Sequence, residues 1–283
     1  MIFLKREKIY PGEIMQKDKK YYFNRLKKFF RNPIEFLKIR KLVDVKLLPN
    51  SDGRFVETDS LRKLYGYLLE SDYLNVDEFL KESKLLSFSD SESVESLNLL
   101  FDKHGSDKGS HHGYTKVYHA IICQQLSTKK DCVIFEIGIG SNNLDVQSNM
   151  GIEGIPGASA RAFRDFSSKI KLIIGDIDER ILFEEERINS YYVDQLKNNT
   201  LENFFSISKY DIAIDDGLHS LRSNLNFFIK ALDKKTSNSW IVIEDINLSD
   251  TYFWQNISDI STHFSDSWVI KLNHSFQFVM YIR

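Results

Sequence analysis

The second half of the chain alternates short apolar runs with helical segments, and this alternation restricts the fold more than any other feature. The apolar runs are DCVIFEIGIG (131–140), KIKLIIGDID (169–178), YDIAIDDG (210–217) and SWIVIEDI (239–246). The helical segments GASARAFRDF and SLRSNLNFFIKALD lie between them. Continuous apolar strands with intervening helices are typical of a parallel sheet that is covered on both faces. We therefore predict an α/β, Rossmann-like fold with a mostly parallel sheet.

The chain ends with two further strand-like runs, SWVIKL and FQFVMYIR, which are separated only by Asn-His-Ser. This spacing predicts a C-terminal antiparallel hairpin. Ahead of the sheet, NVDEFLKESKLL and DSESVESLNLLFDKHG each open with a capping residue and keep an apolar stripe, as helices do. We expect a smaller, mainly helical N-terminal region over residues 1–95 and the sheet domain over residues 96–283.

The charge of the N-terminal region is uneven. Residues 1–50 contain 14 Lys or Arg against 5 Asp or Glu, whereas residues 51–100 contain 5 against 11. The basic part includes two short amphipathic helices, KDKKYYFNRLKKFF and RNPIEFLKIRKLV. Peripheral contact with anionic membrane lipid would use such helices. We favour a packed extension with its lysines in water, because lysine-flanked apolar stripes are ordinary in amphipathic helices. No nucleic-acid-reading motif accompanies the basic segment, so we expect no nucleic-acid partner.

The remaining composition indicates a cytoplasmic protein. No apolar run approaches the roughly 18 residues that a membrane-spanning helix needs. The start, MIFLKREKIY, becomes charged too soon for a signal peptide. The two cysteines, Cys123 and Cys132, lie in apolar surroundings, which favours buried free thiols over a disulfide framework or a thiolate metal site.

Acidic residues and glycines mark the strand ends. Glu136 precedes a turn that contains Gly138 and Gly140, and Asp176 ends the second strand. The third and fourth strands end in Asp215, Asp216, Glu244 and Asp245. In open parallel sheets, ligands bind beyond the carboxyl ends of the strands. A dinucleotide-binding motif would need a third glycine at the position of Asn143, so the sequence argues against NAD binding. Asp176 lies at the end of the next strand, where the ribose diol of a bound nucleoside would need a hydrogen-bond acceptor.

The adjacent carboxylates require an explanation, because neighbouring acids repel and are costly to desolvate. Asp216, Glu244 and Asp245 come from two strand ends and could converge on one Mg²⁺, which prefers oxygen ligands. His219 follows three residues after Asp216, where a neutral imidazole could accept a proton. The alternatives are solvated turns for the acids and no chemical role for His219. We leave Asp215 unassigned, as a possible hydrogen-bond acceptor beside the site.

These motifs resemble those of the class I S-adenosylmethionine (SAM)-dependent methyltransferases. Glu136, Gly138 and Gly140 match their first motif, and Asp176 matches the acid that binds the SAM ribose. More narrowly, SDKGSHHGYTKVYH, GASARAFRDF, GDID, VDQ, IDDGLH and IEDI, within about residues 102–246, resemble the mycinamicin-type sugar O-methyltransferases. That family is metal-dependent and acts on hydroxyls of deoxysugars.

The resemblance implies SAM and Mg²⁺ as cofactors. Asp194 and Gln195 match the pair near the SAM adenine, and Ser159 lies in the loop near the cofactor. The segment with Lys108 and Tyr114 would close over the methionine end. The family's Mg²⁺ ligands match Asp216, Glu244 and Asp245. A helix cap at Asp194 and a packing aromatic at Tyr114 are the alternatives that the residues leave open.

We therefore expect a SAM- and Mg²⁺-dependent O-methyltransferase that modifies a sugar hydroxyl of a glycan or nucleotide-sugar intermediate, in surface polysaccharide or natural-product glycoside synthesis. His219 would take the proton and Asp216 would hold the metal during in-line transfer of the methyl group. The alternatives are a methyltransferase of a small non-sugar metabolite and a non-catalytic Rossmann-like assembly protein. Because the resembling family commonly forms multimers, we expect a homo-oligomer.

Overall fold

The computed structural model describes residues 73–283 of the 283-residue chain. The two basic amphipathic helices expected before residue 50, and most of the expected N-terminal region, lie outside the described residues. Within residues 73–283, no helix is both long enough and apolar enough to cross a membrane.

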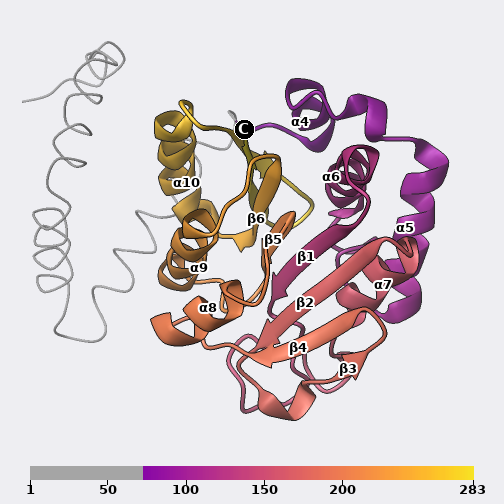
Figure 1. Ribbon diagram of the computed structural model, residues 1–283, viewed down its shortest axis with the longest axis vertical. Helices are drawn as coiled ribbons and strands as arrows, with labels where there is room; N and C mark the ends of the chain where they lie inside the picture. The colour runs from indigo at the N-terminus through magenta and orange to yellow at the C-terminus, as the bar shows by residue number, and fades with distance from the viewer. Residues whose placement is uncertain (1–72) are drawn as a thin grey trace, which may run out of the picture. The chain divides into compact units, whose positions relative to one another are not determined.

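An eight-stranded sheet forms the centre of the described part, in the order β3-β4-β2-β1-β5-β6-β8-β7 (Figure 1). The strands are β1 Cys132–Ile137, β2 Ile170–Asp176, β3 Glu184–Glu185, β4 Ile188–Tyr192, β5 Ile212–Asp215, β6 Ser239–Ile246, β7 Ser265–Lys271 and β8 Phe276–Ile282. Strands β4, β2, β1, β5 and β6 are parallel, while β8 runs antiparallel to β6 and to β7. The predicted parallel α/β sheet and its C-terminal hairpin are confirmed.

Helices cover the sheet on both sides (Figure 1). They are α4 Val76–Glu82, α5 Ser91–His104, α6 Thr115–Thr128, α7 Ala158–Phe166, α8 Asn198–Phe205, α9 Leu221–Asp233 and α10 Leu248–Ser261, with short 3₁₀ helices η2 Leu86–Phe88 and η3 Glu179–Ile181. The predicted caps are confirmed, since the side chains of Asn75 and Asp90 accept backbone N–H groups at the starts of α4 and α5. The expected domain boundary at residue 95 lies inside α5.

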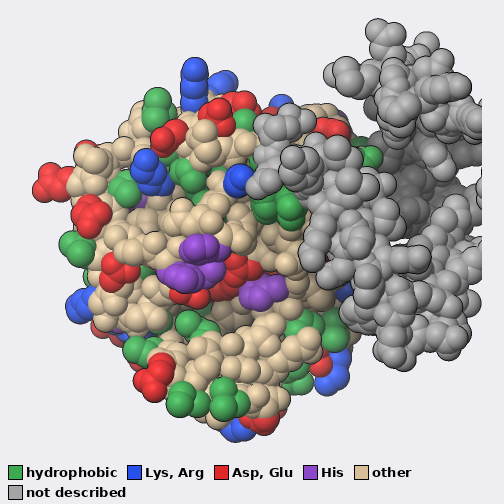
Figure 2. Space-filling view, turned by 180° about the vertical axis from the view of Figure 1, so that it is seen from behind, with side chains coloured by type: hydrophobic (Ala, Val, Ile, Leu, Met, Phe, Trp, Pro, Cys, Tyr) green, Lys and Arg blue, Asp and Glu red, His purple; other side chains and the backbone are tan. Residues whose placement is uncertain are grey.

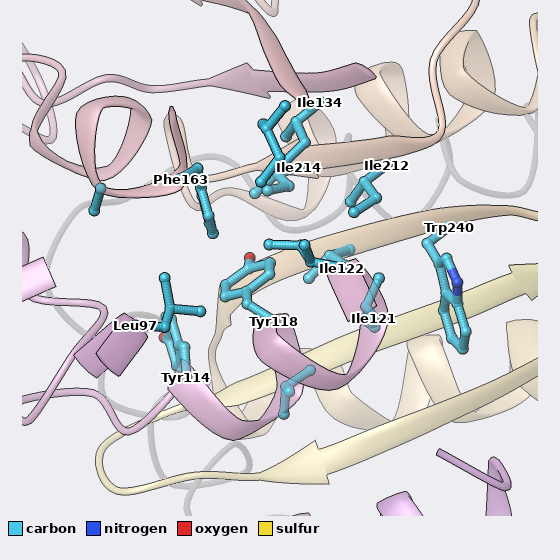
Figure 3. Close-up of a cluster of buried hydrophobic side chains, with 14 of the residues drawn as sticks. Leu97, Tyr114, Tyr118, Ile121, Ile122, Ile134, Phe163, Ile212, Ile214 and Trp240 are labelled. Carbon is cyan, nitrogen blue, oxygen red and sulfur yellow. The ribbon is translucent and has the colours of Figure 1, made fainter. Parts of the chain in front are cut away.

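Alternate residues of each central strand enter different cores. Ile134 of β1 packs with residues of α4 to α7, whereas its neighbour Phe135 packs against Phe204 and Phe205 of α8. Figure 3 shows the first of these clusters, in which Tyr118 of α6 lies among apolar side chains from the sheet. Burial on both faces explains why these strands are continuously apolar. It also leaves the strand ends as the places for polar side chains.

The strand order places a topological switch point between β1 and β5. From β1 the chain proceeds to β2 and β4 on one side, and then returns to β5 and β6 on the other. In the parallel register, Ile137 of β1 lies opposite Asp215 of β5, so the residues after both strands emerge together. Open α/β sheets bind their ligands at such a point.

Replacing Ile214 by Ala tests how much the central strand contributes to stability. The side chain is fully buried in β5, so the Ile214→Ala variant should lose about 2–5 kcal/mol of unfolding free energy. Ile229 on α9 is 52% exposed, and Ile229→Ala should change stability by no more than about 0.5 kcal/mol. Urea denaturation of both variants measures this difference. Equal losses in the two variants would contradict the buried position of β5.

Candidate active site

A cavity of about 880 Å³ opens at the carboxyl edge of the sheet. Its wall is formed by the segments that follow β1, β2, β4 and β5, by Asp245 near the end of β6 and by part of the connection between α5 and α6. The predicted site residues among its lining are Lys108, Gly138, Gly140, Ser159, Asp176, Asp194, Gln195, Asp216, His219 and Asp245. Figure 2 shows histidine and acidic side chains gathered at the centre of one face of the molecule.

The glycine turn after β1 allows two strand ends to touch. Gly138 has a φ of 85°, and a Cβ atom there would lie 1.9 Å from the carbonyl oxygen of Asp216. Gly140 also has a φ of 85°, and its Cβ would lie 2.1 Å from the sulfur of Met150. Only glycine combines this backbone conformation with such close contacts. The glycine turn therefore allows the backbone after β1 to pack directly against the backbone after β5 at the switch point.

Two aspartates after β2 hold the cavity wall in place. Asp176 accepts the backbone N–H groups of Ile139 and Asp178, at 3.0 and 2.9 Å. Asp178 accepts hydrogen bonds from Ser141 and Asn143 in the segment after β1, at 2.6 and 2.7 Å. Burial raises the pKa of Asp176, whereas hydrogen bonding to the Arg180 guanidinium is the main reason that the pKa of Asp178 is lowered. Asp178 thus stabilises the loop over the site.

Glu136 is fully buried at the end of β1. The hydroxyl of Ser159, at the start of α7, donates to its Oε1 over 2.8 Å. Its Oε2 is a buried oxygen without a hydrogen-bond partner in the described part of the chain. Burial raises the pKa of Glu136, while the nearby Lys108 opposes this effect. The Ser159 hydroxyl therefore links the start of α7 to the end of β1.

Gln195 connects the segment after β4 to the turn after β5. Its amide nitrogen donates to Asp215 over 2.5 Å, and its amide oxygen accepts the backbone N–H of Leu218 at 2.8 Å. Asp194 lines the same part of the cavity and accepts the backbone N–H of Leu196 at 2.9 Å. The side chain of Asp194 does not cap α8, because the N-cap position of that helix is Lys197.

The ammonium group of Lys108 lies among three carboxylates. It donates to Asp216, donates to Oε2 of Glu244 over 2.6 Å, and lies 3.5 Å from Oε1 of Glu136. Tyr118 of α6 donates to the other oxygen of Glu244. Burial is the largest effect on Lys108, but the surrounding carboxylates outweigh it and its pKa is strongly raised. Lys108 therefore stays charged and compensates the buried acids.

Asp245 is turned into the cavity by an irregularity in β6. The pairing of β6 with β8 shifts register between Ile243 and Ile246, and Asp245 has a φ of 49°. Such a bulge changes the direction of a side chain at the end of a strand. Tyr114 donates to Asp245 Oδ1 over 2.5 Å. Although burial raises the pKa of Asp245, this hydrogen bond and the nearby His219 lower it overall.

Asp216, His219 and Asp245 converge on one point. His219 Nε2 lies 3.8 Å from Asp216 Oδ1 and 3.9 Å from Asp245 Oδ2, and one donor atom of each residue lies within 4.8 Å of the others. Two of the three predicted metal ligands thus meet beside the predicted base. The third, Glu244, is bound by Lys108 and Tyr118 and does not line the cavity.

Sequence reasoning missed two residues of this site. Tyr118 lies four residues after Tyr114, so both hydroxyls project from one side of α6 towards Asp245 and Glu244. This spacing was visible in the sequence and was a usable signal. His112 lies with Nδ1 3.9 Å from Asp245 and with Nε2 3.4 Å from Asp107, and the hydrogen bond to Asp107 raises its pKa. Nothing in the sequence indicated that pairing.

Substituting Gly138 tests the contact between β1 and β5. Gly138→Ala combines a left-handed backbone with a Cβ placed against backbone atoms, so it should destabilise the protein and displace the turn at Asp216. Gly151 has a φ of 76° with open space around a Cβ, so Gly151→Ala should cost only the conformational strain of about 1–2 kcal/mol. Thermal unfolding compares the stabilities of the two variants with that of the wild type. A loss for Gly138→Ala no larger than that for Gly151→Ala would contradict this contact.

Asp215 provides a pH-dependent prediction. Burial raises its pKa to about 6, so the folded protein binds its proton more tightly than the unfolded chain does. The resulting loss of stability is absent below pH 4, grows as the pH rises, and reaches up to about 3 kcal/mol above pH 6. In EDTA, Asp215→Asn should therefore lose less stability than the wild type between pH 4 and pH 7.5. Urea denaturation at several pH values measures this. The same pH dependence of the unfolding free energy in Asp215→Asn and in the wild type would refute the prediction.

The comparisons with known proteins agree with this geometry. No family model matches the chain. The 8-demethyl-8-alpha-L-rhamnosyl tetracenomycin-C 2'-O-methyltransferase of Streptomyces olivaceus is 25% identical over 190 residues, which cover 67% of this chain and 48% of that protein. The MycE methyltransferase of mycinamycin biosynthesis, in complex with Mg, SAH and mycinamycin VI, superposes with a TM-score of 0.52 and 18% identity, over 66% of this chain and 55% of MycE.

A further crystal form of MycE, with Mg and SAH, superposes with a TM-score of 0.53 and 15% identity. It covers 66% of this chain and 53% of MycE, so the chain spans about half the length of these relatives. These superpositions show a shared fold. The chain therefore has the fold of the class I SAM-dependent methyltransferases and, among them, resembles the metal-dependent sugar O-methyltransferases.

Proposed function

We propose that the chain is a SAM- and Mg²⁺-dependent O-methyltransferase that acts on a sugar hydroxyl of a glycosylated natural product. The observation that carries this proposal is the convergence of Asp216, His219 and Asp245 on the wall of a cavity that also contains the glycine turn and Asp176. The names of the relatives support the acceptor class, since one is named as a 2'-O-methyltransferase of a rhamnosyl tetracenomycin and another was crystallised with mycinamycin VI.

The cavity suits the charge of SAM. Within the described lining, Lys108 and Arg180 are the only Lys or Arg residues, and several acids surround them. A positively charged sulfonium is favoured in such a field. Asp176 would accept the ribose hydroxyls, because its carboxylate already lies at the cavity wall with spare acceptor capacity. Asp194 and Gln195, beside the same wall, would border the adenine.

The carboxylates at the site suit a hard cation. The ammonium of Lys108 lies between Asp216 and Glu244 and shows that these two acids can bind a positive charge. Asp216, Glu244 and Asp245 would hold Mg²⁺, which prefers oxygen ligands and leaves positions for the acceptor. When bound, the ion would fix a sugar diol and stabilise negative charge on the reacting oxygen.

His219 would act as the general base. Its backbone has a φ of 51°, a conformation that His and Asn adopt more readily than most residues, and it brings the ring towards the two aspartates. The imidazole would accept the proton of the attacking hydroxyl as the new C–O bond forms. Proton transfer of this kind contributes about 10²–10⁴-fold to a rate. The products are the methylated sugar and S-adenosylhomocysteine.

Turnover with a rhamnosylated acceptor, SAM and Mg²⁺ tests the proposal through release of S-adenosylhomocysteine. Asp245→Asn should abolish metal-supported turnover, because the metal loses a charged ligand. His219→Asn preserves the backbone preference and should reduce kcat by about 10²–10⁴-fold. Both variants should still bind SAM in calorimetry, since neither residue is placed against the glycine turn or Asp176.

Asp233→Asn, an exposed change at the end of α9, is the matched control and should retain wild-type turnover. Nucleotide sugars and polysaccharide fragments serve as competing acceptors, and small phenols represent the non-sugar metabolites. Full activity of the Asp245 and His219 variants after EDTA treatment would refute the mechanism. No SAM binding by the wild type would refute the methyltransferase assignment. Cytoplasmic location and assembly into homo-oligomers stay predictions.

A further inference from the structure

Lys108 is the buried cation at the centre of the site. Its side chain is 2% exposed, and its ammonium contacts Asp216 and Glu244. The backbone around it is anchored, because the Lys108 N–H donates to Ser106 Oγ at 3.4 Å and its carbonyl accepts the Tyr114 N–H at 3.0 Å. A fixed backbone with a flexible four-carbon side chain allows the charge to move while the loop stays in place.

Both oxygens of Glu244 already accept a hydrogen bond, and the Lys108 ammonium lies between Glu244 and Asp216. Oε2 of Glu244 accepts the ammonium at 2.6 Å, its Oε1 accepts the Tyr118 hydroxyl, and the residue is fully buried. Asp216 is shared in the same way, since one oxygen accepts Lys108 while the other lies 3.8 Å from His219. A divalent ion that uses both carboxylates must therefore take the place of the ammonium group.

A second acceptor for Lys108 lies on the other side. Oε1 of Glu136 is 3.5 Å from the ammonium, and Oε2 of Glu136 has no partner in the described part of the chain. A rotation of the lysine side chain would exchange Asp216 and Glu244 for Glu136 without leaving the ammonium unpaired. An unpaired buried charge would be costly, so this second acceptor is what makes the exchange feasible.

We propose that Lys108 holds the place of the divalent cation in the metal-free enzyme, and that metal binding displaces its ammonium from Asp216 and Glu244 towards Glu136. The inference rests on the proposed function, because it takes Glu244 and Asp216 as metal ligands. Lys108 is then a residue that sets metal affinity. Metal binding becomes an exchange of one cation for another, and its free energy is reduced by the interactions that Lys108 gives up.

Metal titration of the full chain by calorimetry, without SAM, tests the exchange. Lys108→Met keeps the length of the side chain and removes its charge, and it should bind Mg²⁺ and Mn²⁺ more tightly by about tenfold or more. Arg180→Met is the matched control. It removes one positive charge from the same cavity lining, but Arg180 pairs with Asp178 and Asp145, so its affinity should stay within about threefold of the wild type.

Equal or weaker metal binding by Lys108→Met would overturn the exchange and leave the proposed function standing. An equal gain in Arg180→Met would also overturn it, because the cause would then be net charge alone. If neither the wild type nor the variants bind a divalent ion, the metal site of the proposed function fails as well.

A measurement on the wild type covers the case in which Lys108→Met does not fold. Crystal structures of the wild type with and without Mn²⁺ locate the ion by its anomalous scattering and the Lys108 ammonium by its density. The exchange predicts that the ammonium lies beside Glu136 when Mn²⁺ is bound by Asp216 and Glu244. An ammonium that still contacts Asp216 and Glu244 while the ion is bound would overturn the proposal.

Discussion

Burial of both faces of the parallel sheet is the constraint on which the rest of the structure depends. Strands β1, β5 and β6 are covered by α4 to α7 on one side and α8 to α10 on the other, so their middle residues are apolar. Polar side chains have room only where the strands end. The switch in strand order between β1 and β5 then brings these ends around one cavity.

The adjacent aspartates at the end of β5, Asp215 within the strand and Asp216 directly after it, coexist because they face different partners. Successive residues of a strand point to opposite sides. Asp215 turns towards Gln195 and the backbone of Gly217, where it is fully buried. Asp216 reaches Lys108 and His219 at the cavity. One carboxylate therefore supports the turn, and the other is available for chemistry.

The sequence was most informative where one local property decides the structure. Continuous apolar runs identified β1, β2, β5 and β6, and capping residues identified α4 and α5. Strand β4, which lies between β2 and the edge strand β3, was not predicted because its sequence, INSYY, is largely exposed and lacks an apolar run. For the same reason, the short β3 had no signal. Both strands are stabilised by pairing with their neighbours, which sequence patterns do not report.

By itself, the sequence determined the kinds of groups at the site: a glycine turn, acids at four strand ends and a histidine after the third. Only the tertiary structure decided which of them meet. Lys108 lies 108 residues before Asp216 and 136 before Glu244, and nothing local links it to either. The bulge that turns Asp245 into the cavity also depends on pairing with β8. Contacts over such distances arise from strand order and register, which many residues set together.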